Sequence, residues 1–151
     1  MTTTKTRMEL FVEFINNPSH AAAEKIVSAD AVFHVPGRPE PEIGPSGYLE
    51  IIAMMRSGFS DVQWVLEETI TEGDNVAARF TMRGTHDGNF FGVPATRRQI
   101  SVQAMNFYRW SGDKIIAERG QPDLLGLLQQ IGSIIGIGSG WRGMTPSRVG
   151  S

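Results

Sequence analysis

Cysteine is absent from this sequence of 151 residues, and histidine occurs only three times. Without cysteine the chain can form no disulfide, no thiolate nucleophile and no cysteine-ligated zinc or iron–sulfur site. The histidines stand in unrelated positions, and no group of carboxylates has the spacing of a calcium-binding loop. We therefore expect no metal site, and any chemistry should come from oxygen and imidazole groups.

Long runs of apolar residues or of one charge are also missing. The formal net charge is −2 and the basic residues are scattered, which disfavours nucleic acid as a partner. No window approaches the roughly 20 apolar residues of a membrane-spanning helix. The Thr-rich segment from Met1 to Arg7 lacks the apolar core and cleavage site of a secretory signal. We expect a cytoplasmic protein without a membrane partner.

The sequence has no nucleotide-binding motif at a junction between a predicted strand and a predicted helix. No Gly-x-Gly-x-x-Gly motif or phosphate-cradling loop stands between a predicted strand and a predicted helix, and the Gly-x-Ser-x-Gly motif of serine hydrolases does not occur. The sequence therefore predicts no cofactor and no serine nucleophile.

The first half of the chain predicts three helices and one strand. Apolar residues recur with helical spacing over residues 8–17, 21–27 and 48–58, and residues 30–35 have the composition of a strand. With 40% hydrophobic residues, a chain of this length forms a single domain around one core.

In the second half, the apolar residues follow the twofold period of strands. Turn signals at residues 73–75, 87–89 and 111–113 divide residues 61–122 into four strands. A last helix is predicted over residues 124–131, capped by Asp123. This order predicts an α+β fold in which a curved antiparallel sheet wraps around the amino-terminal helices and encloses a cone-shaped pocket.

We predict a domain boundary near the end of the last helix. Residues 1–132 should form the single domain. Residues 133–151 are rich in Gly and Ser but include several Ile residues and Trp141. We expect this tail to be either docked on the protein or disordered.

Three segments of the second half carry a recognisable pattern: Gly84–Thr96 (GTHDGNFFGVPAT), Asn106–Ile115 (NFYRWSGDKI) and Asp123–Gly132 (DLLGLLQQIG). Together they resemble the SnoaL-like polyketide cyclases of the nuclear transport factor two-like superfamily. The resemblance implies the superfamily's α+β barrel fold and cofactor-independent acid/base chemistry, such as closure of a polyketide ring by intramolecular aldol addition in antibiotic biosynthesis. The chain departs from the family at Glu118-Arg119-Gly120, where the family commonly has an acidic residue followed by His and Trp.

Asp123 is the first candidate for a catalytic acid/base. The resemblance implies that the cyclases' essential aspartate lies at this junction between strand and helix. A carboxylate there could remove a proton from an activated carbon, and an apolar pocket would raise its pKa. The alternative is that Asp123 only caps the last helix, which contributes about 1 kcal/mol.

His34 and His86 are the other candidate acid/base residues. His34 ends a short strand that also contains the apolar Val32, and alternation places His86 on the inward face of its strand. Each could face a pocket. The alternative for His34 is a core imidazole satisfied by a backbone carbonyl, and for His86 a bond to the adjacent turn.

Asn106 and Tyr108 are predicted to bind substrate oxygens. Asn106 interrupts an apolar row of its strand, and a buried amide without a partner costs on the order of 1 to 3 kcal/mol. Tyr108 on the same row could donate its hydroxyl to an enolate oxygen. The alternative is a structural hydrogen bond between strands.

Five aromatic or adaptable apolar residues complete the predicted site, with membership of the plain core as the alternative. They are Trp64, Tyr48, Phe80, Met55 and Phe59.

Together these residues favour an enzyme that acts on a polyketide or related ketone without a cofactor. The alternatives are a hydroxylase, isomerase or dehydratase with the same pocket, or a small-molecule binding protein without catalysis. Arginines and threonines gather on one predicted face of the sheet, at Arg79, Thr81 and Arg83 among others. Together with the apolar tail, this predicts a homodimer formed sheet to sheet.

Overall fold

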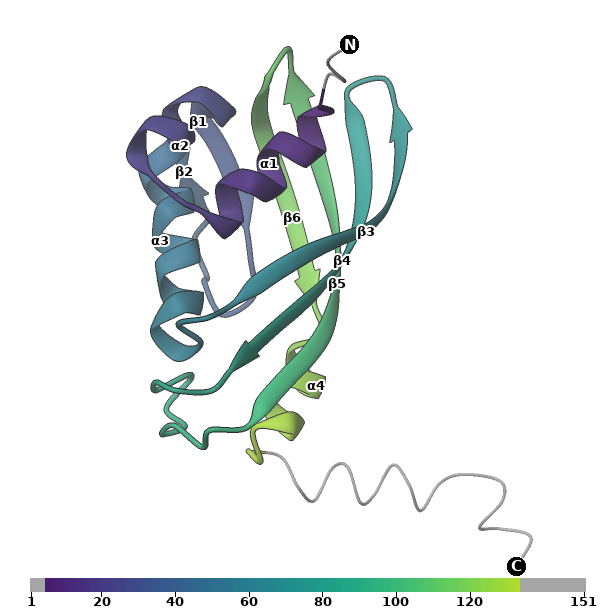
Figure 1. Cartoon of the computed structure of the whole chain (residues 1–151). Coiled ribbons are helices and arrows are strands. Elements are labelled where there is room, and N and C mark those ends of the chain that lie inside the picture. The colour runs from purple at the N-terminus through teal and green to yellow at the C-terminus, as the bar shows by residue number, and fades with distance from the viewer. Residues whose placement is uncertain (1–4, 134–151) are drawn as a thin grey trace, which may run out of the picture.

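The computed structural model describes residues 5–133 and contains the predicted helices and strands in order, with the unpredicted two-residue strand Glu42–Ile43 in addition (Figure 1). The elements are α1 (Arg7–Asn16), α2 (His20–Ile26), β1 (Val27–His34), β2 (Glu42–Ile43), α3 (Gly44–Gly58), β3 (Gln63–Glu72), β4 (Asn75–Thr85), β5 (Gln99–Ser111), β6 (Lys114–Pro122) and α4 (Leu124–Gln130). The predicted tail lies outside the described residues from position 134 onward.

The helix ends follow local sequence rules. The Thr6 side chain accepts a hydrogen bond from the Glu9 backbone, and the Glu9 side chain accepts one from the Thr6 backbone, so that α1 begins with a capping box. α3 begins at Gly44, earlier than its apolar period indicates, because Pro45 fits the first turn of a helix. Asp123 caps α4 as predicted.

The six strands form one sheet in the order β2-β1-β6-β5-β4-β3. Four neighbouring pairs are antiparallel, whereas β1 and β6 run parallel. The prediction of a fully antiparallel sheet is therefore corrected to a mixed sheet within the α+β class. Hairpin signals reveal pairing between consecutive strands, but β1 reaches β6 only through the whole intervening chain, so no local signal predicts this pair.

The connection from β4 to β5 is a long loop over residues 86–98 rather than a tight turn. The backbone N–H groups of Asp87 and Gly88 both donate to the carbonyl of Gly58 at the end of α3. A Cβ atom on Gly88 would lie 1.9 Å from the Ser57 carbonyl oxygen, so only glycine permits this approach. The turn signal at residues 87–89 therefore anchors a loop to a helix.

The long strands curl around the helices. Figure 1 shows α1, α2 and α3 on one face of the sheet and α4 at its lower end, near the start of β5. One buried cluster joins α1, α2 and α3 to β1 and the upper sheet, and a second lies around Phe59, Phe90 and Leu127. No helix in residues 5–133 has the length and apolar character needed to cross a membrane.

Candidate active site

A cavity of about 110 Å³ lies between α3 and the inner face of β4, β5 and β6. Its walls are largely apolar, with contributions from α3, the long strands, the loop before β5 and α4. The polar side chains in its lining, among the described residues, are Tyr48, Asn106, Tyr108 and Glu118, with the indole of Trp64 beside them. A mainly apolar cavity with a few converging polar groups is typical of a small-molecule site.

Strand alternation carries the polar groups into the cavity. On β5, Ala104, Asn106 and Tyr108 occupy alternate positions and all three line the cavity. On β6, Glu118 and Gly120 do the same. The β5–β6 register pairs Tyr108 with Glu118 and Asn106 with Gly120, so the polar residues of the two strands are cross-strand neighbours.

Glu118 is a carboxylic acid inside this apolar wall, with 5% of its surface exposed. Burial raises its pKa from the ordinary value of 4.5 to about 8, and a hydrogen bond from the Tyr48 side chain opposes part of that rise. Its Oε1 atom is buried and has no hydrogen-bond partner among residues 5–133. Glu118 therefore carries its proton at neutral pH.

Two tyrosines lie beside this carboxyl group. Burial is the main cause that raises the pKa of both Tyr48 and Tyr108, and negative charge on Glu118 raises them further. Their rings are fixed by aromatic contacts, Tyr48 with Phe33 at 4.6 Å and Tyr108 with Phe11 at 5.2 Å between ring centroids. Both hydroxyls therefore stay protonated and can act as hydrogen-bond donors.

Both ends of the Asn106 side-chain amide are hydrogen-bonded to other groups of the protein. Its Oδ1 accepts from the backbone N–H of Gln121 at 3.0 Å, and its Nδ2 donates to the Tyr108 hydroxyl at 3.0 Å. The structure thus supports the alternative in which Asn106 makes a structural hydrogen bond between strands, although the residue also lines the cavity.

The predicted apolar lining is found in large part. Trp64, Tyr48, Phe80 and Met55 all line the cavity. Phe59 does not: it is fully buried in the second core cluster, with its ring 5.1 Å from that of Phe90. That prediction is corrected to a core role.

The structure places Asp123 outside the cavity, contrary to the role predicted for it. Its side chain is exposed and accepts a hydrogen bond from the backbone N–H of Gly126 at 2.9 Å, while its own N–H donates to the carbonyl of Gln103. Asp123 follows the end of β6, where the strand alternation no longer applies. The contacts of Asp123 are therefore those of a helix cap, and Asp123 is not among the described residues that line the cavity.

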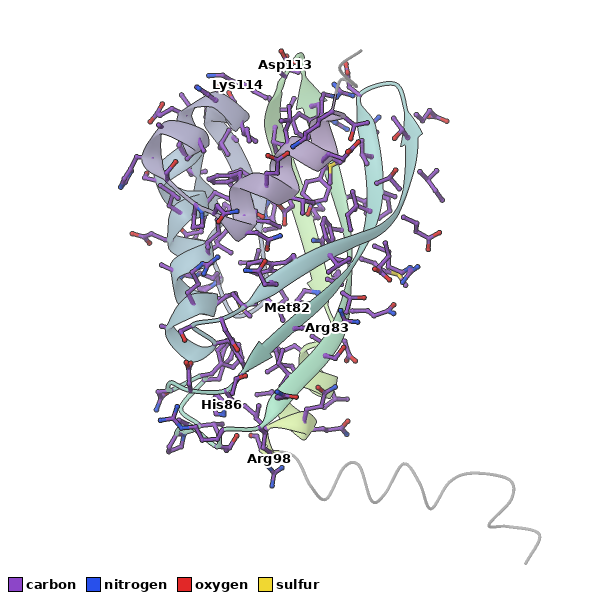
Figure 2. All side chains as sticks on the ribbon, in the orientation of Figure 1. Met82, Arg83, His86, Arg98, Asp113 and Lys114 are labelled. Carbon is purple, nitrogen blue, oxygen red and sulfur yellow. The ribbon has the colours of Figure 1, made fainter. Side chains whose placement is uncertain are left out.

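His86 is inward-facing and fully buried, as alternation predicts, but it does not line the cavity. Its Nδ1 accepts from the backbone N–H of Thr96 at 3.2 Å, and its backbone pairs with Arg97 and Arg98. Figure 2 shows His86 and Arg98 together at the lower end of the sheet, far from Asp113 and Lys114 at the upper end. His86 holds the ends of the 86–98 loop together.

His34 lies on the opposite face of β1 from the one predicted. Ala31 and Phe33 near the end of this strand are both fully buried, and Val35 lines the cavity on the same side. His34 is half-buried and is not part of the cavity wall. Val32 is apolar but half-buried as well, so it misled the assignment of the inward face.

Glu118 was missed as a site residue because a bulge changes the alternation of β6. Register passes from Trp110↔Ile115 to Arg109↔Ala117, so one residue of β6 is extra. Counting by twos from the buried Ile115 would place Ala117 and Arg119 inside and Glu118 outside. The available signal was the acidic residue of the family triplet, at Glu118 itself.

The arrangement can move a proton between a carboxyl group and a ligand. In the protonated form Glu118 is an acid, and after it loses its proton it is a stronger base than an exposed glutamate. The tyrosine hydroxyls can stabilise negative charge on a ligand oxygen. The described residues that line the cavity include no Lys, Arg or His.

Comparisons with a family model and with individual proteins identify the same family. The SnoaL-like polyketide cyclase family matches residues 5–131. The aklanonic acid methyl ester cyclase DnrD of Streptomyces peucetius is 33% identical over 104 residues, which are 68% of this chain and 72% of the relative. The nogalonic acid methyl ester cyclase of Streptomyces nogalater is 32% identical over 100 residues, 66% of this chain and 75% of that one.

Solved structures show the same fold. Wild-type IdmH from Streptomyces antibioticus superposes with a TM-score of 0.75 and 27% identity, over 83% of this chain and 96% of that one. TsrD from Streptomyces laurentii has a TM-score of 0.74 and 26% identity, over 85% and 93% of the two chains. The α+β fold predicted from the sequence is therefore confirmed.

Proposed function

This chain belongs to the SnoaL-like polyketide cyclase family, and from that premise we propose that it closes a ring in a polyketide or related ketone by cofactor-independent intramolecular aldol addition, with Glu118 as the acid/base. The observation that carries the proposal is the buried Glu118 carboxyl group in an apolar cavity beside two tyrosine hydroxyls, where burial raises its pKa to about 8. The two curated relatives above are named as methyl ester cyclases, which supports the reaction type.

The proposed reaction needs one proton to leave carbon and one to reach oxygen. The carboxylate form of Glu118 takes a proton from a carbon that stands between two carbonyl groups, which forms an enolate. The enolate carbon then forms a bond to a ketone carbon of the same molecule, and the resulting alkoxide takes the proton back from Glu118. Protons and electrons balance within the substrate and Glu118, and no other reactant is consumed.

The raised pKa of Glu118 suits this cycle. A carboxylate with a pKa of about 8 is a better match for an activated C–H bond than an exposed one, since proton transfer improves as the two pKa values approach. The cost is that only a fraction of the enzyme holds the base form at pH 7. The rate of proton abstraction should therefore rise with pH up to about 8.

The charge of the cavity favours an uncharged substrate. Glu118 can become negative, and no basic side chain among the described lining residues would compensate a second negative charge. A carboxylate on the ligand would lose its hydration on entry without gaining a partner. We therefore propose that an esterified ketone is accepted and the corresponding free acid is rejected.

The test is hydrogen–deuterium exchange at the activated carbon of aromatic polyketide esters, followed by NMR at neutral pH. Glu118→Gln should slow exchange by about 10²-fold or more, the usual contribution of a general base, while Asp123→Asn, outside the cavity, should retain it. Loss of exchange in Asp123→Asn with retention in Glu118→Gln would overturn the assignment. Binding without exchange in the wild type would instead point to a small-molecule binding protein.

We also propose that the chain forms a homodimer through the outer face of the sheet. Ile70, Met105 and Phe107 expose 73%, 63% and 67% of their surface there, and register places Ile70, Ala77 and Phe107 in one row across β3, β4 and β5. Such a row of exposed apolar residues is typical of an interface. Sedimentation should show a dimer that Phe107→Lys dissociates; a wild-type monomer at micromolar concentration would refute it.

A further inference from the structure

We propose that Asn106 is a positioning residue that fixes the direction of the Tyr108 hydroxyl, so that Tyr108 donates its proton into the cavity. The hydrogen bonds themselves run from the backbone of Gln121 to Asn106 and on to Tyr108. The catalytic consequence of this direction rests on the function proposed above, whereas the direction itself can be tested by ligand binding alone.

The orientation of the Asn106 amide follows from its backbone partner. The Gln121 N–H lies 3.0 Å from Oδ1, and a backbone N–H can only donate. The amide oxygen must therefore face Gln121, which leaves Nδ2 facing the Tyr108 hydroxyl at 3.0 Å. A reversed amide would place two donors against each other at Gln121.

The direction of the second bond follows in turn. The amide nitrogen has no acceptor capacity, so Tyr108 must accept from Asn106 and cannot donate back to it. Among residues 5–133, Asn106 makes the one hydrogen bond that the Tyr108 hydroxyl has. Tyr108 is 3% exposed and lines the cavity, so its proton remains for a ligand oxygen or for the neighbouring Glu118.

The absence of a side chain at Gly120 leaves space for the side-chain amide of Asn106. A Cβ atom at this position would lie 3.3 Å from Glu118 Oε2 and 3.4 Å from Asn106 Oδ1. Register places Gly120 directly opposite Asn106 on the neighbouring strand. The glycine therefore lets the amide settle on the Gln121 N–H while the carboxyl group stays beside it.

Asn106→Asp reverses this direction with little change of shape. Once the new carboxyl group is ionised it accepts at both oxygens, so at a pH high enough to ionise it, it would take the Gln121 N–H on one side and the Tyr108 O–H on the other. The ligand then loses the donor that Tyr108 supplies. We expect kcat to fall at least about tenfold and KM to rise only about threefold, since a donor to developing charge acts mainly in the transition state.

A double-mutant analysis distinguishes reversal of the Asn106–Tyr108 hydrogen bond from a non-specific loss of activity. If Asn106 acts through Tyr108, then Asn106→Asp should lower kcat strongly in the wild type but less than about twofold in the Tyr108→Phe background. Equal fold-losses in both backgrounds would overturn the proposal. Asn106→Leu, which is neutral and of similar size, should be milder than Asn106→Asp, because it leaves the Tyr108 proton free; a larger loss would also contradict it.

A binding arm tests the same point without catalysis. In the Glu118→Gln background, which removes the effect of a new charge on Glu118, the probe is 2-naphthol, measured by fluorescence titration. Tyr108→Phe and Asn106→Asp should each weaken binding by at least about threefold and give no further loss together. Additive losses of affinity would refute the proposal that Asn106 acts through Tyr108. Non-additive losses in a protein that shows no exchange activity would support that proposal and refute only the proposed function. Circular dichroism checks that each variant folds.

Discussion

The surroundings of Glu118 and of Asp123 differ although the two residues are close on the chain. Glu118 lies within β6 among apolar walls and two tyrosines, with 5% of its surface exposed. Asp123 lies just beyond the strand, is exposed, and uses its carboxylate on the first turn of α4. Loss of water raises the pKa of the first carboxyl to about 8, whereas one oxygen of the second accepts a hydrogen bond from a backbone N–H.

This contrast shows that position in a motif does not decide which acid can do chemistry. An acid/base needs access to the ligand and a pKa near the working pH; Glu118 lines the cavity and burial raises its pKa to about 8, which is why we propose it for this role. Asp123 meets the requirements of a helix cap.

The largest expected effect is on the pH dependence of stability. In the unfolded chain Glu118 loses its proton near 4.5, but in the folded protein it keeps it until about pH 8. Between these values the unfolded state binds fewer protons, so the free energy of unfolding should fall by up to about 1.4 kcal/mol per pH unit as pH rises, and level off above pH 8.

Glu118→Gln is the matched control for that fall, because glutamine resembles the protonated acid. Urea denaturation at several pH values should find the two proteins similar near pH 4.5 and the variant more stable by a few kcal/mol near pH 8. A constant difference across this range would show that Glu118 is not held in its neutral form.

A smaller effect is expected at Asp123. Asp123→Ala removes the acceptor for the Gly126 N–H, which should lower the free energy of unfolding by about 1 kcal/mol, with kcat nearly unchanged. Asp123→Asn keeps an acceptor and should lose less. Urea denaturation measures the free energy of unfolding, and steady-state kinetics measures kcat. A fall in kcat larger than the loss of folded protein explains would show that Asp123 takes part in the reaction.

The smallest effect on stability is expected at Gly120. Its Cβ would meet Glu118 Oε2 and Asn106 Oδ1 at 3.3 and 3.4 Å, contacts that a small shift can relieve. Gly120→Ala should therefore change the free energy of unfolding by less than about 1 kcal/mol, since reduced freedom of the unfolded chain offsets part of the strain. The rate should still fall, because both polar groups must move. An unchanged rate would show that their placement is not critical.

Local patterns predicted the elements well. The apolar period of α1, the turn signals at residues 73–75 and 111–113, and the cap at Asp123 depend on neighbours in sequence, and all three were found. The parallel pairing of β1 with β6 was not predicted, because it joins distant segments.

The site was harder to predict than the fold. Asn106 and Tyr108 were placed at the cavity because β5 alternates without interruption over that stretch. Glu118 was missed because the bulge in β6 shifts its alternation, and His34 was misplaced because its strand has half-buried residues on one face. A carboxyl group's environment depends on elements that only the folded chain brings together.

The most direct test of the account is the titration of the Glu118 carboxyl carbon by ¹³C NMR, with Glu118→Gln used to assign the resonance. We expect a midpoint near pH 8, well above the ordinary value of 4.5. A midpoint near that ordinary value would contradict it, because Glu118 would then be a solvated carboxylate at neutral pH and not the proton carrier of an apolar site.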